Sequence, residues 1–130
     1  MTQPSILGNA TLVAFVPTTD PVKARSFYEE LLGLRLVADE EPFALVFDAN
    51  GTMLRVTTVA EYQAQTFTIL GWKVEDIEAT VKRLTAAGVV FLRYPGLNDN
   101  SPLAIWTAPS GARIAWFNDP DNNVLSLTQF

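Results

Sequence analysis

The stretch TLVAFVPTTDPVKARSFYEELLG, residues 11–33, contains the signals of a strand followed by a helix. Its apolar, β-prone start, Thr11–Val16, predicts a buried strand. Asp20-Pro21 predicts the start of a helix, because aspartate caps free N–H groups and proline suits the first helical position. Apolar residues then recur at helical spacing as far as Gly33, which tolerates the left-handed backbone of a helix end.

The remainder of the chain extends this unit and then repeats it. Further strands are expected at 35–39, 43–47 and 52–58, with Asn50-Gly51 as the turn before the last of these. Asp76 follows an apolar run over 66–74 and precedes a second helical stripe that ends at Gly88, as Asp20 does in the first half. Four more strands are then expected, at 89–93, 103–107, 112–117 and 124–129.

This duplication predicts an α+β fold in which two βαβββ repeats form a curved mixed or antiparallel sheet around a cleft, with the helices on its outer face. Residues 1–10 are a leader, and residues 11–130 form a single domain. Repeat one covers about 11–60 and repeat two about 66–130. Neither repeat is long enough to bury a stable core alone, so the two should pack together.

The amino-acid composition excludes several kinds of catalytic and binding site. The 130 residues include no histidine and no cysteine, which excludes disulfides, thiolate nucleophiles, imidazole bases and Cys/His zinc sites. The net charge is −5 and no cluster of Lys and Arg occurs, which argues against a nucleic-acid partner. The start has no basic region followed by a long apolar run, and no stretch reaches membrane-spanning length. We therefore expect a cytoplasmic protein that does not bind membranes.

Two segments resemble the vicinal oxygen chelate superfamily, which includes glyoxalase I, extradiol dioxygenases, fosfomycin-resistance enzymes and bleomycin-resistance proteins. They are VPTTD with ARSFYEELLGL, residues 16–20 and 24–34, and FNDPDNNVLSL, residues 117–127. The resemblance covers residues 11–129. Asn122 stands where the family usually has glycine, and asparagine tolerates the left-handed backbone that this turn needs.

Metal-dependent members of that superfamily bind a divalent ion through four strand positions, usually His, Glu or Gln. The resemblance places these positions at Val13, Arg55, Ile69 and Ser126. Two aliphatic chains, a guanidinium and a hydroxyl are unsuited to Zn²⁺, Fe²⁺ or Mn²⁺. A shift of one residue brings in no better ligands, so we expect neither a metal site nor a cofactor.

Arg55 alternates with apolar Leu54 and Val56, so it should point away from the core. It is either an anchor for an anionic or carbonyl-bearing ligand, or a surface arginine or member of an internal ion pair. Lys73 follows Ile69 and Gly71 on the same predicted face and is a weaker candidate of the same kind.

Other side chains are candidates for lining the cleft. Phe15 shares the alternation of Val13 and should lie on the cleft floor. Trp106 and Trp116 lie on neighbouring predicted strands and are either packing residues or the wall of a flat pocket. Ser126 can donate a hydrogen bond, but no histidine is available to activate it as a nucleophile.

These observations predict a metal-free protein that binds or sequesters a small molecule in a cleft, as the bleomycin-resistance branch does. Two alternatives stay open: a metal-independent lyase or isomerase that uses Arg55 as an electrophile, and an accessory dimeric module with a vestigial cleft. The ligand, and any catalytic residue, are left undefined. The resemblance also implies a homodimer.

Overall fold

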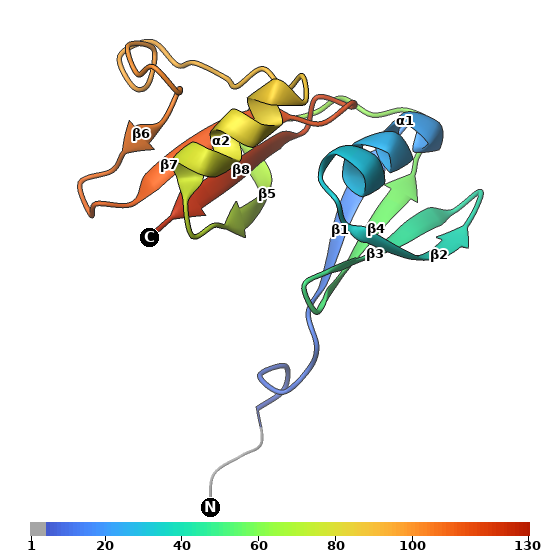
Figure 1. The fold of residues 1–130 in the computed structure, drawn as a ribbon. Coiled ribbons are helices and arrows are strands. Elements are labelled where there is room, and N and C mark those ends of the chain that lie inside the picture. The colour runs from blue at the N-terminus through green and yellow to red at the C-terminus, as the bar shows by residue number, and fades with distance from the viewer. Residues whose placement is uncertain (1–4) are drawn as a thin grey trace, which may run out of the picture.

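The computed structural model describes residues 5–130 and places their strands in two separate sheets, each of four strands (Figure 1). The strand order is β1-β4-β3-β2 in the first sheet and β5-β8-β7-β6 in the second. The predicted fold class, α+β with two βαβββ repeats, is confirmed, although the repeats form two sheets and not one continuous sheet. Residues 1–4 of the expected leader lie outside the described residues.

The first half builds a mixed sheet. Strand β1 pairs in parallel with β4, and the other neighbours are antiparallel. Asn50 has φ 51° and Gly51 φ 96°, so the predicted turn between β3 and β4 is confirmed. The strands are β1 Val13–Thr18, β2 Arg35–Glu40, β3 Ala44–Ala49 and β4 Thr52–Thr58.

The helical segment of this half begins as predicted. Helix α1, Pro21–Arg25, is capped by Asp20, whose carboxylate accepts a hydrogen bond from the Lys23 backbone N–H. It continues as a π-helix, η1, over Ser26–Leu31, so that the Leu32 N–H reaches back to the Phe27 carbonyl. The widened turn had no signal in the apolar spacing.

The second half repeats the topology with a longer helix, α2 Ile77–Ala86, capped by the Asp76 side chain. Its outer strand again pairs in parallel, β5 with β8, and β7 lies antiparallel to β8. The strands are β5 Thr68–Lys73, β6 Trp106–Thr107, β7 Arg113–Asn118 and β8 Val124–Gln129. Figure 1 shows α2 in front of the second sheet and α1 in front of the first.

Two predicted strands of the second half are largely wrong. Residues 89–93 form no strand, and of 103–107 only the two residues of β6 are regular. Arg93 and Asn98 explain why, since their side chains bond to backbone carbonyls between residues 92 and 104 and hold a turn-rich loop there. One backbone bond to β7 remains, from the Leu92 N–H to the Trp116 carbonyl, and side-chain hydrogen bonds take the place of a longer ladder.

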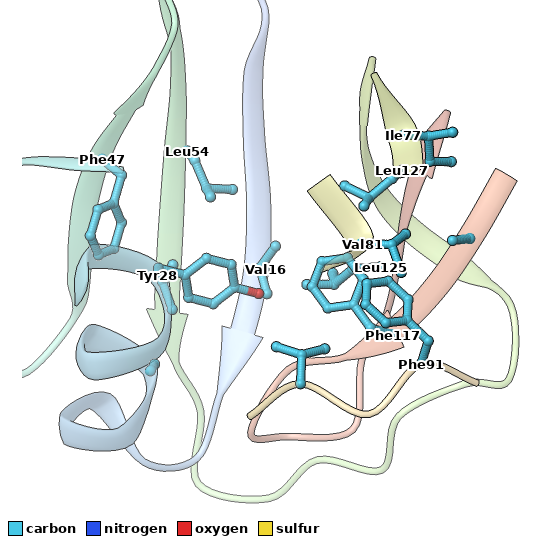
Figure 2. Close-up of a cluster of buried hydrophobic side chains, with 14 of the residues drawn as sticks. Val16, Tyr28, Phe47, Leu54, Ile77, Val81, Phe91, Phe117, Leu125 and Leu127 are labelled. Carbon is cyan, nitrogen blue, oxygen red and sulfur yellow. The ribbon is translucent and has the colours of Figure 1, made fainter. Parts of the chain in front are cut away.

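One hydrophobic cluster joins the two halves (Figure 2). Phe27 of η1 lies 6.3 Å from Phe117 of β7, measured between ring centroids. Each sheet thus has a face that packs on this cluster and a face that does not. The fully buried members include Val16, Tyr28, Phe47, Leu54, Ile77, Phe117 and Leu125. No helix among residues 5–130 is long and apolar enough to cross a membrane.

Candidate functional site

Each sheet presents an open face, by which we mean the side turned away from the hydrophobic cluster. Leu54 and Val56 belong to the cluster, so Arg55 between them lies on the first open face. Leu125 and Leu127 belong to it as well, so Ser126 lies on the second open face. The candidate ligand residues therefore divide between two surfaces.

The first open face has Arg55 at its centre. In the strand register Arg55 lies opposite Phe15 on one side and Val46 on the other. Its Nη2 is 2.8 Å from Oε1 of Glu40, and the Arg55 side chain is 27% exposed. Of the alternatives that the sequence left open for Arg55, the structure shows the ion pair. The guanidinium already has a carboxylate partner.

Apolar side chains surround this ion pair. Phe15 is 64% exposed, Met53 40% and Val13 37%. Because these large apolar side chains are exposed, no other part of the described chain covers this face.

The second open face has the equivalent row of residues, Gly71, Ser126 and Trp116, on β5, β8 and β7. Gly71 lacks the side chain that Phe15 supplies in the first half. A Cβ at Gly71 would lie 2.5 Å from the Ser126 hydroxyl, so this hydroxyl fills part of the space that the missing side chain leaves, which we call the gap at Gly71. Ser126 itself is 9% exposed. No hydrogen bond from the Ser126 hydroxyl to another group occurs within the described part of the chain.

Aromatic rings border this gap. Trp116 stacks with Trp106 at 6.2 Å between ring centroids and an interplanar angle of 29°. Tyr94 meets Trp116 edge-on at 5.4 Å and 88°. Both indoles are only partly buried. A partly exposed aromatic group next to an unbonded hydroxyl can stack on a flat ligand and hydrogen-bond to its edge.

The remaining predicted residues lie beside this surface. Lys73 is exposed on β5, in register with Thr128. Ile69 sits where the β5–β8 register shifts, between Thr68 and Leu70. Its half-buried side chain packs against the hydrophobic cluster, so it does not continue the alternation of Gly71 and Lys73 that the sequence suggested.

The positions that correspond to the family's metal ligands do not fit a divalent cation. Val13 and Arg55 lie on the first sheet, and Ile69 and Ser126 lie on the second. Arg55 is a cation held by Glu40, and Val13 and Ile69 have no donor atom. Across residues 5–130 no group of three or more His, Cys, Asp or Glu side chains is placed to hold an ion.

The Asp119–Asn123 turn connects the second half to the first. The Asp119 carboxylate accepts hydrogen bonds from the Tyr28 hydroxyl at 2.7 Å and from the Asn123 side-chain amide at 2.9 Å. It also accepts from the backbone N–H groups of Asp121 and Asn123. Asn122 has φ 66°, which confirms that asparagine takes the left-handed position in this turn.

Asp121 holds the junction between β1 and α1. Its carboxylate accepts hydrogen bonds from the hydroxyls of Thr18 and Thr19 at 2.6 and 2.7 Å, and from the Thr19 N–H at 2.8 Å. Burial by itself would raise the pKa of Asp121, but these bonds outweigh it and hold that pKa below its ordinary value. Burial, then the Asp119 charge, raises the pKa of Tyr28, so this phenol stays protonated as a donor.

Sequence reasoning did not find the aromatic partner Tyr94 or the contacts of the Asp119–Asn123 turn. Tyr94 follows a segment that was predicted as a regular strand, and the motif at 119–123 was interpreted as a turn only. The sequence does contain a signal for the contacts of the turn. Two carboxylates in one turn with no nearby Lys or Arg need other hydrogen-bond donors.

Comparison with known proteins places these features in a family. The profile of the Glyoxalase/Bleomycin resistance protein/Dioxygenase superfamily matches residues 10–127. A comparison with curated proteins gives no match.

Solved structures of this superfamily have the same fold. A superfamily member from Sphaerobacter thermophilus is 25% identical, with a TM-score of 0.70 over 92% of this chain and 96% of that one. A putative glyoxalase family protein from Bacillus anthracis reaches a TM-score of 0.76 at 14% identity, over 98% of each chain. Lactoylglutathione lyase from Agrobacterium tumefaciens is similar as well, with a TM-score of 0.73 at 14% identity over 95% of each chain. The profile match spans most of the sequence, and the chain therefore belongs to the glyoxalase/bleomycin resistance protein/dioxygenase superfamily.

Proposed function

We propose that this protein binds a small, planar organic molecule on its second open face and does so without a metal ion. The observation that carries the proposal is the row Gly71, Ser126 and Trp116, in which a missing side chain, an unbonded hydroxyl and an indole lie next to one another. Stacking on the indole would supply most of the affinity, and the hydroxyl would orient the ligand.

The first open face is less suited to the ligand. An anion would have to compete with Glu40 for the Arg55 guanidinium, because the two groups are already 2.8 Å apart. The same ion pair argues against Arg55 as an electrophile in a lyase or isomerase. We therefore favour binding over catalysis.

A second copy of the chain would complete the cleft. Within residues 5–130 the hydrogen bonds and ring contacts between the halves involve β1 and its junction with α1, η1, β7 and the Asp119–Asn123 turn, and none joins the two open faces. Exposed Phe15 and Met53 give the first open face an apolar surface to bury. We propose a homodimer in which the first open face of one copy covers the second open face of the other.

A thermal-shift and calorimetry screen tests the binding proposal, with indole and quinoline as planar probes and cyclohexanol as the non-planar comparison. We expect the planar probes to stabilise the protein, with a gain near 2.7 kcal/mol at about 100 times the Kd. Trp116→Ala should abolish this effect. The matched control is Phe43→Ala, since Phe43 is an exposed aromatic residue (72%) of the first half. Equal responses to planar and non-planar probes, or full binding by Trp116→Ala, would overturn the proposal.

The dimer is tested separately by sedimentation of wild-type protein and Phe15→Lys. We expect a dimer for the wild type and a folded monomer for the variant, because a lysine would have to be buried at the interface. A wild-type monomer at concentrations that saturate the probes would contradict the dimer and leave the binding surface in place.

A further inference from the structure

A hollow of about 440 Å³ lies between the linker at residues 62–66 and the adjoining ends of β7 and β8. Tyr62 and Gln65 line it from the linker, and Tyr94 from the loop after α2. Asn118 lines it from the end of β7, and Asp121 lines it from the turn that follows. Its volume is within the usual range for small-molecule sites. No role assigned so far uses this hollow.

The charge around the hollow is of one sign. The lining includes Asp121 and contains no lysine or arginine. Asp119 lies behind it in the same turn and is buried. Over residues 5–130 no ion pair involves either carboxylate. Every hydrogen bond that they accept comes from a hydroxyl, an amide or a backbone N–H.

Two negative charges are thus held in place by neutral donors alone. Such donors satisfy the oxygen atoms but leave the charge itself uncompensated, so the field extends into the adjacent hollow. The pKa of Tyr62 responds to this field. Burial raises the pKa of its phenol first, and the charges of Asp119 and Asp121 raise it further. The Tyr62 hydroxyl lies in the wall of the hollow, 2.6 Å from Oδ1 of Asn123.

The walls also offer aromatic rings. Tyr62 and Tyr94 both line the hollow, and the face of a phenol ring attracts an ammonium group. Asp121 in the lining, Asp119 in the same turn and the two phenol rings all favour a positively charged ligand. A structural role in the turn explains the hydrogen bonds of Asp119 and Asp121. It does not explain why the hollow beside them has no Lys or Arg in its lining.

We propose that this hollow binds a small organic cation, specifically a primary alkylammonium group joined to an aromatic ring through a methylene. The hollow shares Tyr94 with the aromatic border of the gap at Gly71, but Gly71, Ser126 and Trp116 do not line it, so this proposal does not depend on the proposed function. Anions are excluded by the two carboxylates, and neutral molecules of the same shape bind less well because they gain nothing from the field.

Titration of the full chain with three isosteric probes tests the proposal: benzylammonium, benzyl alcohol and benzoate, followed by amide chemical shifts. We expect benzylammonium to bind about tenfold more tightly than benzyl alcohol, and benzoate not to bind. The shifts should centre on the linker at 62–66 and on Asn118. Raising the salt concentration should weaken only the ammonium probe, because screening acts on charge.

Exposed Gln65 provides the variants, because changing it leaves the Asp119–Asn123 turn intact. Gln65→Lys places a cation at the hollow and should weaken benzylammonium about tenfold, with benzyl alcohol unchanged. Gln65→Glu has nearly the same shape and should bind benzylammonium at least as well as the wild type. Asn9→Lys makes the same change of net charge away from the hollow and should have no effect.

The outcomes separate this site from the second open face. Equal affinity for the three probes, or no loss in Gln65→Lys, would overturn the inference. Loss of benzylammonium binding in Trp116→Ala, with Gln65→Lys unaffected, would place the cation on the indoles and likewise overturn it, while leaving the proposed function intact. Conversely, failure of indole and quinoline to bind would leave this cation site standing.

Discussion

The two halves have the same topology, and the same row across each sheet is filled in opposite ways. In the first half the row is Phe15, Arg55 and Val46, and in the second it is Gly71, Ser126 and Trp116. The first row has a charge neutralised by Glu40, and the second has a gap beside a free hydroxyl and an indole. The two halves thus share a topology but differ in the side chains of this row, and the proposed ligand surface lies on the second.

The halves also differ in what they contribute to their junction. The second half supplies the Asp119–Asn123 turn, and the first half supplies the groups that this turn binds, among them Thr18 and Tyr28. The following predictions test these two asymmetries.

The largest effect should come from the turn. Asp119→Ala removes the acceptor of the Tyr28 hydroxyl and of three donors within residues 121–123, all at a buried site. We expect a loss of about 3 kcal/mol in the free energy of unfolding, measured in urea, because buried donors are left unpaired. Glu61→Ala, at an exposed acidic residue, is the control and should change stability by less than about 0.5 kcal/mol. A loss below about 1 kcal/mol for Asp119→Ala would show that the turn does not hold the halves together.

Acid should weaken the same junction by a smaller amount. The pKa of Asp121 is lower in the folded chain than in the unfolded one, so its contribution is complete above its ordinary pKa, about pH 4. As pH falls below that value the folded state loses this stabilisation, until Asp121 is protonated in both states. Urea unfolding of the wild type and of Asp121→Asn measures this loss of stability. A range from about pH 6 to about pH 3 is suitable, because it spans the ordinary pKa of aspartate. A variant with the same pH slope as the wild type would disprove the contribution of Asp121.

Gly71→Ala should close the gap on the second open face. The added Cβ would meet the Ser126 hydroxyl, which has to rotate away. We expect a loss of about 1 kcal/mol in stability together with reduced binding of indole and quinoline. Adding Ser126→Ala should restore most of the stability but not the binding, and a double-mutant cycle measures this coupling. Additive effects of the two changes would contradict the proposed contact.

The smallest effect is expected on the first open face. Arg55→Met removes the ion pair with Glu40, whose side chain is 47% exposed, so the loss should be about 0.5 kcal/mol and should shrink with salt. Arg35→Met is the matched control, since Arg35 pairs with Asp48 on the same sheet at 3.1 Å with a side chain 71% exposed. Binding of the planar probes should be unchanged. If Arg55→Met abolished that binding while Trp116→Ala did not, the roles of the two faces would be reversed.

Local signals in the sequence were sufficient for most of the fold. Asp20 and Asp76 cap the helices as predicted, and β4 and β8 have the predicted bounds. Gly33 and Gly88 take positive φ at the helix ends. Each of these features depends on residues within a few positions of one another, which is why a pattern can reveal them.

Features that depend on distant or irregular contacts were missed. The ion-pair partner of Arg55 is one such feature, because Glu40 is 15 residues away in the sequence and only the strand register brings it to Arg55. The bulge at Ile69 has no local signature, yet it changes which way that side chain points. The expected strand at 89–93 keeps a single backbone bond to β7, from the Leu92 N–H to the Trp116 carbonyl, and the Asn98 side chain binds the next backbone groups, the Leu92 carbonyl and the Tyr94 N–H.

The order in which the chain is synthesised gives the Asp119–Asn123 turn a further consequence. Its bonds to the β1–α1 junction join residues as much as 103 positions apart, so they form only after Asp121 has left the ribosome. Until then the Tyr28 hydroxyl of the nascent first half does not have its acceptor at Asp119, and Phe117 does not yet cover the apolar surface of η1. Truncation before Asp119 should therefore leave the first half more accessible to chaperones and proteases.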